Sequence, residues 1–294
     1  MERLEWLSGT QLPRFRRALL EWYGSRARPL RIRATRDPWA ILVSEVMAQQ
    51  TQIARVDEAW VAFMARYPSP RALADASTAD VLRAWAGLGY NRRALNLQRA
   101  AASIETDHHG RVPQTLDELE ALPGVGPYTA RAVMAIAFGR PVAAVDTNVR
   151  RVLTRVLGQA PSPGQLQAAA DRLVDPADPA TWNHASMELG ATVCVSRDPK
   201  CEACPVATWC MSVGRVRTLV RRTSSNEPAF ELTTRWLRGR IIERLRALDD
   251  DAWDRLPRSI GEHDVEAIES AVAALRREGM LEQRSDGAVR LPSG

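Results

Sequence analysis

The chain has 294 residues, of which 45% are hydrophobic, so it can bury a substantial core in about two domains. No apolar run reaches the roughly 20 residues that cross a bilayer, and residues 1–6 lack the profile of a secretion signal. These features argue against a membrane or secreted protein and predict a cytoplasmic one. The net charge of +5 suits a polyanionic partner, although many proteins that bind no nucleic acid carry a similar excess.

Helix-period patterns dominate the first 220 residues, for example from Ala94 to Ile104. Proline and glycine interrupt them in short loops, at residues 67–70 and 161–164. Alternation of valine, isoleucine and threonine, which is typical of strands, is scarce in this region. The sequence therefore predicts an all-α fold of many short helices.

Two acidic residues stand out in apolar surroundings. Glu45 lies in an otherwise apolar helical segment, and Asp146 directly follows an apolar run. Each has a structural explanation, because Glu45 can pair with an arginine and Asp146 can cap a helix beginning near Asn148. Together they also supply what cleavage of an N-glycosidic bond needs: an acid that protonates the departing base and a carboxylate that stabilises the cationic sugar.

A glycine-rich turn separates two helical segments at residues 122–130, which read Leu-Pro-Gly-Val-Gly-Pro-Tyr-Thr-Ala. Gly124 and Gly126 permit a tight turn whose backbone N–H groups, at the start of the second helix, can point at a phosphate. The segment predicts a helix-hairpin-helix, and an ordinary helix connection is the alternative.

All four cysteines fall in one short stretch, as Cys194-x6-Cys201-x2-Cys204-x5-Cys210. In a chain without signs of secretion, this clustering indicates a metal site and not a disulfide framework. The thiolates suit either a tetrahedral zinc ion or a [4Fe-4S] cluster, and the chemistry alone does not separate the two.

The C-terminal part predicts a small separate domain. Residues 221–228 have the polar composition of a linker. Residues 236–248 and 265–277 are helix-like, and residues 280–284 and 288–291 flank a turn signal as a hairpin. Helices followed by a hairpin favour a winged-helix-like domain, which either contacts DNA or protein or only packs against the core.

Six motifs, in order along residues 14–212, resemble one known superfamily. They are residues 44–52, 87–90, 122–129, 145–152 and 187–191, together with the four cysteines. At these residues the chain resembles the helix-hairpin-helix DNA glycosylases of the endonuclease III superfamily, and within them the adenine DNA glycosylases of the MutY type. The resemblance implies a monofunctional base-excision enzyme that removes adenine mispaired with 8-oxoguanine or guanine.

The resemblance also implies the fold, the cofactor and the partner. It implies a two-lobed all-α core over residues 1–222, with a helical barrel at about 33–146 and a cluster lobe formed by 1–32 with 147–222. The winged-helix-like domain would follow at 228–294. It implies a [4Fe-4S] cluster on Cys194, Cys201, Cys204 and Cys210. Mismatched duplex DNA would be the partner of a monomeric, nucleoid-associated protein.

Carried over by position, the resemblance assigns roles to four catalytic residues. Glu45 would protonate the purine, and Asp146 would stabilise or capture the oxocarbenium sugar. Tyr128 would hydrogen-bond the Asp146 region, and Asn148 would orient the site. Related enzymes that also nick DNA have a lysine at the position of Tyr128 for a Schiff base. The only lysine here is Lys200 in the cysteine loop, which predicts little or no lyase activity.

The resemblance assigns DNA contacts to the turn and to two further side chains. Gln50 and Tyr90 would insert into the duplex and hold the gap left by the flipped base. Leu122, Gly124 and Gly126 would grip the strand backbone.

The implied base pocket departs from the family at two positions. The pocket would consist of Arg28, Leu30, Ile32, Arg33, Ala48 and Ile53. The family has tryptophan at the position of Ile32 and usually leucine at that of Ala48, and pocket shape sets the choice of base. Two alternatives therefore remain: a glycosylase for uracil or thymine opposite guanine, and a non-catalytic DNA-binding iron–sulfur protein.

Overall fold

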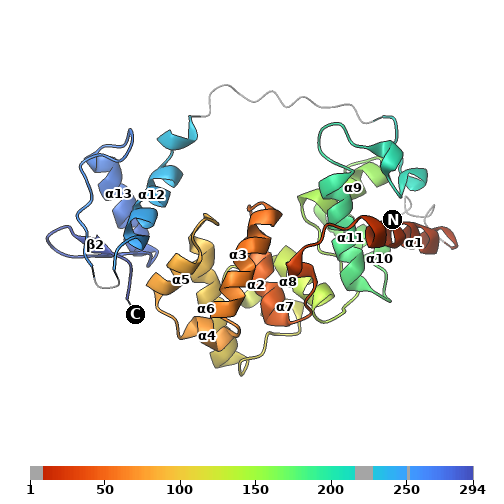
Figure 1. Ribbon diagram of the computed structural model, residues 1–294. Coiled ribbons are helices and arrows are strands. Elements are labelled where there is room, and N and C mark those ends of the chain that lie inside the picture. The colour runs from red at the N-terminus through yellow and green to blue at the C-terminus, as the bar shows by residue number, and fades with distance from the viewer. Residues whose placement is uncertain (1–8, 216–227, 250–251, 294) are drawn as a thin grey trace. The chain divides into compact units, whose positions relative to one another are not determined.

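The computed structural model describes residues 9–215, 228–249 and 252–293 of the chain (Figure 1). These residues form helices with one short hairpin, which confirms the all-α prediction. The expected linker at 221–228 lies almost entirely outside the described residues. No helix in the described part is long and apolar enough to span a membrane.

The described residues form two compact units, the first comprising 9–45, 113–121 and 125–215 and the second 46–112, 122–124, 228–249 and 252–293. The first unit contains α1 (Gln11–Arg26), η2 (Arg31–Arg33), most of α2 (Pro38–Ala48), α7 (Leu116–Ala121), α8 (Pro127–Ile136), α9 (Thr147–Leu157), α10 (Pro163–Leu173), α11 (Pro179–Thr192), η3 (Cys201–Ala203) and η4 (Ala207–Trp209). The second contains the end of α2, α3 (Ile53–Arg66), α4 (Pro70–Ala74), α5 (Thr78–Ala84), α6 (Arg92–Asp107), η5 (Phe230–Leu232), α12 (Thr234–Arg246), α13 (Val265–Arg277), β1 (Glu282–Gln283) and β2 (Val289–Arg290). The expected boundaries of a barrel at 33–146, a cluster lobe and a domain at 228–294 stay predictions.

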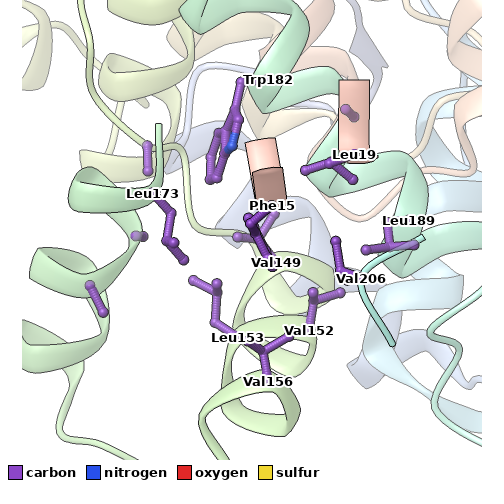
Figure 2. Close-up of a cluster of buried hydrophobic side chains, with 14 of the residues drawn as sticks. Phe15, Leu19, Val149, Val152, Leu153, Val156, Leu173, Trp182, Leu189 and Val206 are labelled. Atoms are coloured by element: carbon purple, nitrogen blue, oxygen red, sulfur yellow. The ribbon is translucent and has the colours of Figure 1, made fainter. Parts of the chain in front are cut away.

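The core of the first unit is built around α9 (Figure 2). Val149, Val152, Leu153 and Val156 recur at helical spacing, so they form one apolar stripe that packs against α11. Phe15 of α1 and residues of the cysteine loop complete the cluster. Each fully buried valine or leucine side chain contributes about 1.5–3 kcal/mol to stability. The apolar stripe that follows Asp146 is therefore anchored in the core.

In the second unit, α4 and α5 pack against α6. The side chains of Ser69 and Ser77 cap α4 and α5 by accepting hydrogen bonds from backbone N–H groups. Trp85 is fully buried and meets Phe63 edge to face, with ring centroids 5.7 Å apart. This packing fixes the loop that leads to Tyr90.

The C-terminal segment consists of two helices and a hairpin, in the order that the sequence predicted. α12 packs on α13 (Figure 1). β1 pairs antiparallel with β2, with Glu282 opposite Arg290. Several hydrogen bonds join the segment to the rest of the second unit. Among them, Arg83 Nη2 donates to the carbonyl O of Leu248 at 3.1 Å, and the N–H of Ala79 donates to the carbonyl O of Pro292 at 2.9 Å. The winged-helix identity of this segment stays a prediction.

Candidate active site

Glu45 lies near the end of the apolar helix α2, in the first unit. Its neighbours Ile41 and Leu42 are buried, and its Oε2 is shielded from solvent without a hydrogen-bond partner. Burial raises the pKa of Glu45 to about 7, opposed by a hydrogen bond from Tyr128 and reinforced by the charge of Asp146. A carboxyl with this pKa is substantially protonated at neutral pH, so it can donate a proton.

Asp146 is the N-cap of α9, as the sequence suggested. Its Oδ1 accepts from the N–H of Val149 at 2.6 Å, and its Oδ2 accepts from Asn148 Nδ2 at 2.8 Å. The positive end of a helix dipole favours a negative charge at this position. The cap and the expected catalytic carboxylate are therefore the same group, and the cap fixes its orientation.

Tyr128 lies in the first turn of α8, close to Glu45 and Met187. Its hydroxyl hydrogen-bonds Glu45 and approaches the sulfur of Met187 at 3.6 Å. The partners found for the phenol are therefore Glu45 and Met187, and a hydrogen bond to the Asp146 region stays a prediction. Burial, with the charges of Glu45 and Asp146, raises the pKa of Tyr128 well above its ordinary value. The phenol therefore remains a neutral donor beside Glu45.

A buried ion-pair cluster accompanies these groups in the first unit. Glu188 of α11 is fully buried and accepts from Arg28 Nε at 2.6 Å and from Arg33 Nη2 at 2.7 Å. Burial alone would raise the Glu188 pKa, but the hydrogen bonds of the two arginines outweigh it and lower the pKa. Arg33 also stacks over Tyr23, with its guanidinium carbon 5.6 Å from the ring centroid. Arg28 and Arg33 were expected at the base pocket, whereas Glu188 was not singled out as a site residue.

A chain of hydrogen bonds leads from Asp146 towards the cysteines. Asn148 donates to Asp146 and accepts from Arg151 Nη2 at 2.9 Å. Arg151 Nε in turn donates to the carbonyl O of Cys194 at 2.8 Å. Gly190 lies against Asn148, where an added Cβ would meet Asn148 Cβ at 2.7 Å. The side chain of Asn148 is thus fixed by hydrogen bonds to Asp146 and Arg151, and its backbone packs against Gly190.

The four cysteines are brought together around one cavity of the first unit. Cys194, Cys201, Cys204 and Cys210 line it, and all four are free thiols. Arg155 also lines the cavity and donates to Cys194 Sγ at 3.3 Å. Among the described residues, no three histidine, cysteine or acidic side chains are arranged to hold a single metal ion.

Gln50 and Tyr90 share an unusual backbone conformation in the second unit. Their φ angles are +58° and +46°, in the left-handed region that residues other than glycine seldom adopt. Both side chains are exposed. Such strain persists only where the surrounding structure enforces it, and it gathers at functional sites.

Buried Arg93 is the group that holds both of these loops. Its Nη1 donates to the carbonyl O of Val46 at 2.9 Å and to that of Met47 at 2.7 Å. Its Nη2 reaches Thr51 Oγ1, beside Gln50, and the carbonyl O of Gly89, beside Tyr90, both at 3.0 Å. Sequence reasoning missed Arg93, because arginines are abundant in this chain and nothing local marks one as buried.

The glycine turn has the expected conformation. Leu122 is buried, and Gly124 has a φ of +80° that glycine adopts readily. An added Cβ at Gly124 would meet Asn96 Cβ at 2.8 Å, whereas nothing lies near Gly126. The backbone at Gly126, the N-cap of α8, is therefore open to a ligand.

The expected base-pocket residues are divided between the units. Arg28, Leu30, Ile32 and Arg33 belong to the first unit with the catalytic candidates. Ala48 and Ile53 belong to the second. All six are partly exposed. The structure thus groups the two arginines with Glu45, Tyr128, Asp146 and Asn148 in one unit.

Comparison with known proteins finds relatives among DNA glycosylases. Residues 43–176 match the model of the HhH-GPD superfamily of base excision DNA repair proteins. The chain is 38% identical to an adenine DNA glycosylase of Mycolicibacterium smegmatis, over 93% of this chain and 94% of that protein. Its fold is similar to a thermostable thymine-DNA glycosylase, with TM-score 0.67 and 29% identity over 71% of this chain and all of that one. It is also similar to endonuclease III in a non-covalent DNA complex, with TM-score 0.59 and 26% identity over 68% of this chain and 95% of that one.

Proposed function

Because the chain belongs to the HhH-GPD superfamily of base excision DNA repair proteins, and within it to the adenine DNA glycosylases, we propose that it removes adenine mispaired with 8-oxoguanine or guanine. The substrate is duplex DNA, and the reaction is hydrolysis of the N-glycosidic bond. The proposal rests on the environment of Glu45. Its carboxyl is shielded from solvent and accepts a hydrogen bond from Tyr128, and burial together with the nearby charge of Asp146 raises its pKa to about 7.

The mechanism follows from the different environments of the two carboxyls. The target base leaves the helical stack and enters the site. Glu45 Oε2 protonates a ring nitrogen of adenine, which turns the base into a better leaving group. As the bond to the sugar breaks, Asp146 stabilises or captures the positive charge, and water completes hydrolysis. The neutral phenol of Tyr128 hydrogen-bonds the Glu45 carboxyl before and after the proton transfer. Asn148 fixes the orientation of Asp146 by donating a hydrogen bond to it.

The ion-pair cluster supports recognition of a purine. Glu188 fixes the guanidinium groups of Arg28 and Arg33, so that their remaining N–H donors have a set direction. Adenine offers ring-nitrogen acceptors to such donors. Arg28 is the more exposed of the two, with 40% of its side chain accessible, and is the better placed to reach a ligand.

We expect base removal without strand cleavage. Schiff-base chemistry needs a lysine amine at the sugar. The only lysine is Lys200, which lines the cysteine cavity, and Tyr128 stands at the position that bifunctional relatives give to lysine. The protein is expected to act as a monomer at the nucleoid.

The four cysteines are proposed to hold a [4Fe-4S] cluster, and the spacing that they share with the endonuclease III superfamily favours this cluster over a zinc ion. Their four free thiols line one cavity, which supports a shared group. When bound by Cys194, Cys201, Cys204 and Cys210, the cluster supplies a four-point link across the loop and a group that can exchange electrons.

Removal of thymine or uracil opposite guanine is the second candidate. It is favoured by the fold similarity to a thymine-DNA glycosylase and by Ile32 and Ala48, which are smaller than the tryptophan and leucine that the adenine glycosylases have at these positions. The two candidates share one mechanism and differ in the base.

Single-turnover base release distinguishes them. The duplexes carry adenine opposite 8-oxoguanine, adenine opposite guanine, and thymine or uracil opposite guanine, with Asp146→Asn as the inactive control. Fast adenine release, lost in the variant, supports the proposal. Release of thymine or uracil alone contradicts it in favour of the second candidate. Binding of duplex without release of any base would indicate a non-catalytic DNA-binding protein.

A further inference from the structure

The C-terminal segment contacts the second unit at the strained residue Tyr90. The guanidinium of Arg235, in the first turn of α12, lies 5.2 Å from the centroid of the Tyr90 ring and donates a hydrogen bond to its hydroxyl. The same guanidinium lies 4.7 Å from the ring centroid of Phe230. One cation thus sits against two aromatic rings that lie far apart in the sequence.

Solvent reaches this group of side chains. Tyr90 is 40% exposed and Phe230 is 48% exposed, and Arg235 is also exposed. An arginine stacked on a ring keeps N–H donors at its edge free for a phosphate. An exposed aromatic ring offers a face to a base or a deoxyribose. The combination of one exposed cation and two partly exposed aromatic rings matches the phosphates and bases of a nucleic-acid strand.

The charges along α12 single out Arg235. Arg238 pairs with Glu278 at 2.7 Å, Arg240 pairs with Glu243, and Arg244 pairs with Asp254. Arg246 is partly buried and donates to Asn91 Oδ1 at 2.8 Å. Of the five arginines of this helix, only Arg235 is exposed and has no acidic or amide partner among the described residues.

The position of Arg235 is held by the fold around it. Trp236, the next residue, packs on Gly261, where an added Cβ would meet its ring at 2.7 Å, and stacks on His263. The bond from Arg246 to Asn91, next to Tyr90, keeps α12 beside the Tyr90 loop. The segment therefore presents Arg235 at one fixed place.

We propose that Tyr90, Phe230 and Arg235 form one DNA-binding surface, through which the C-terminal segment contacts the duplex next to the residue that enters it. Arg235 neutralises a backbone phosphate, and Phe230 packs on a neighbouring deoxyribose or base. The inference rests on the proposed function for the choice of ligand, mismatched duplex DNA. It gives the C-terminal segment a role in substrate binding in addition to packing.

Equilibrium binding of the full chain to a labelled duplex tests the proposal. The duplex carries adenine opposite 8-oxoguanine, and all proteins carry Asp146→Asn, so that no base is released. Arg235→Ala should raise Kd by about tenfold and lower the slope of log Kd against log salt concentration by about one. Phe230→Ala should raise Kd by about fivefold to tenfold with an unchanged salt slope, because only stacking is lost.

Arg240→Ala is the matched control, because it removes an arginine of the same helix whose charge Glu243 already neutralises. It should leave Kd and slope within twofold of the parent. Arg235→Lys should keep the salt slope while losing part of the affinity, which a purely structural role would not produce. An unchanged Kd and slope in Arg235→Ala, or an equal loss in Arg240→Ala, overturns the proposal. Base release by the protein with Asp146 intact is scored separately, so a failure of the proposed function remains distinguishable.

Discussion

At neutral pH, the buried carboxyl of Glu45 lowers the free energy of unfolding. Its shielded Oε2 lacks a partner, and its pKa of about 7 means that ionisation is disfavoured in the folded protein. The folded pKa is raised above the ordinary value of 4.5, so the protonated form is favoured by folding. The contribution of this group to the free energy of unfolding is therefore fully present below pH 4.5 and is lost as the pH rises through about 7.

Glu45→Gln should consequently abolish base release and yet stabilise the protein. The difference between 4.5 and about 7 corresponds to about 3 kcal/mol at pH 8, and to no gain at pH 4. Denaturant unfolding at the two pH values measures the effect. Exposed Glu58→Gln serves as the control and should change neither property. A destabilised Glu45→Gln protein at pH 8 would show that the carboxylate is satisfied in the fold.

The same group predicts the pH dependence of catalysis. A general acid must be protonated, so single-turnover adenine release should be constant below about pH 7 and fall about tenfold per pH unit above it. The measurement is the rate at saturating enzyme between pH 5.5 and 9. A rate that stays level through pH 8 would exclude Glu45 as the proton donor.

Arg93 illustrates a residue that acts through others. Because its guanidinium satisfies carbonyls on both loops, Arg93→Ala leaves buried acceptors unpaired and should destabilise the protein by about 3 kcal/mol. Arg93→Lys retains the charge but not the fork, and should bind duplex more weakly because Gln50 and Tyr90 lose their enforced conformations. Thermal unfolding and duplex Kd report the two effects. Full duplex affinity in Arg93→Lys would separate Arg93 from the positioning of these loops.

At the scale of elements, the close approach of α11 to the start of α9 is decisive for the site. Gly190 has no side chain, and an added Cβ would lie 3.0 Å from the carbonyl O of Asn148 and 2.7 Å from its Cβ. Gly190→Ala must displace the turn that orients Asp146. We expect base release to fall at least tenfold while duplex binding changes little, because the displaced groups act on the sugar.

Gly164 provides the comparison for that experiment. It also lies in a helix, α10, and nothing lies within reach of an added Cβ. Gly164→Ala should leave release unchanged and raise the midpoint of thermal unfolding slightly, since alanine favours a helix. Equal release by Gly190→Ala and the parent protein would mean that α9 adapts without moving Asp146.

At the scale of the whole molecule, local sequence patterns predicted the elements better than the contacts between them. Helical periodicity over residues 94–104 marked α6, and the residues flanking 285–287 marked the hairpin of β1 and β2. Asp146 as an N-cap was visible because a cap is a local feature. Each of these signals lies within a few residues of the structure that it predicts.

The missed features depend on distant partners. Glu188 is one acidic residue in an α11 sequence, and its importance arises from Arg28, which lies 160 residues away in the chain. The direction of the Tyr128 hydroxyl depends likewise on α2. The left-handed conformations at Gln50 and Tyr90 occur next to groups that Arg93 hydrogen-bonds, Thr51 and Gly89, and leave no mark in the local sequence. A single sequence carries no information on which arginine meets which partner.

The cysteine loop should determine the stability of the whole first unit. Val206 and, in part, Cys204, Cys210 and Trp209 pack into the core around α9, and Trp209 Nε1 donates to Gln11 of α1 at 2.9 Å. Cys204→Ser should therefore reduce iron content and visible absorbance, and lower the midpoint of thermal unfolding. Iron analysis, absorbance and thermal unfolding of the same preparation measure these changes.

The hydrogen bonds from Cys194 to Asp146 predict how such damage reaches the chemistry. If the loop moves, Arg151 loses its bond to the Cys194 carbonyl, and Asn148 loses the donor that fixes it against Asp146. Arg151→Gln should then slow base release while the iron content stays normal. Cys204→Ser should lower both the rate of base release and the iron content. If Arg151→Gln released the base at the normal rate with full iron content, the hydrogen bonds through Asn148 would not connect the cysteine loop to Asp146. The loop would then affect the site only through the global stability of the protein.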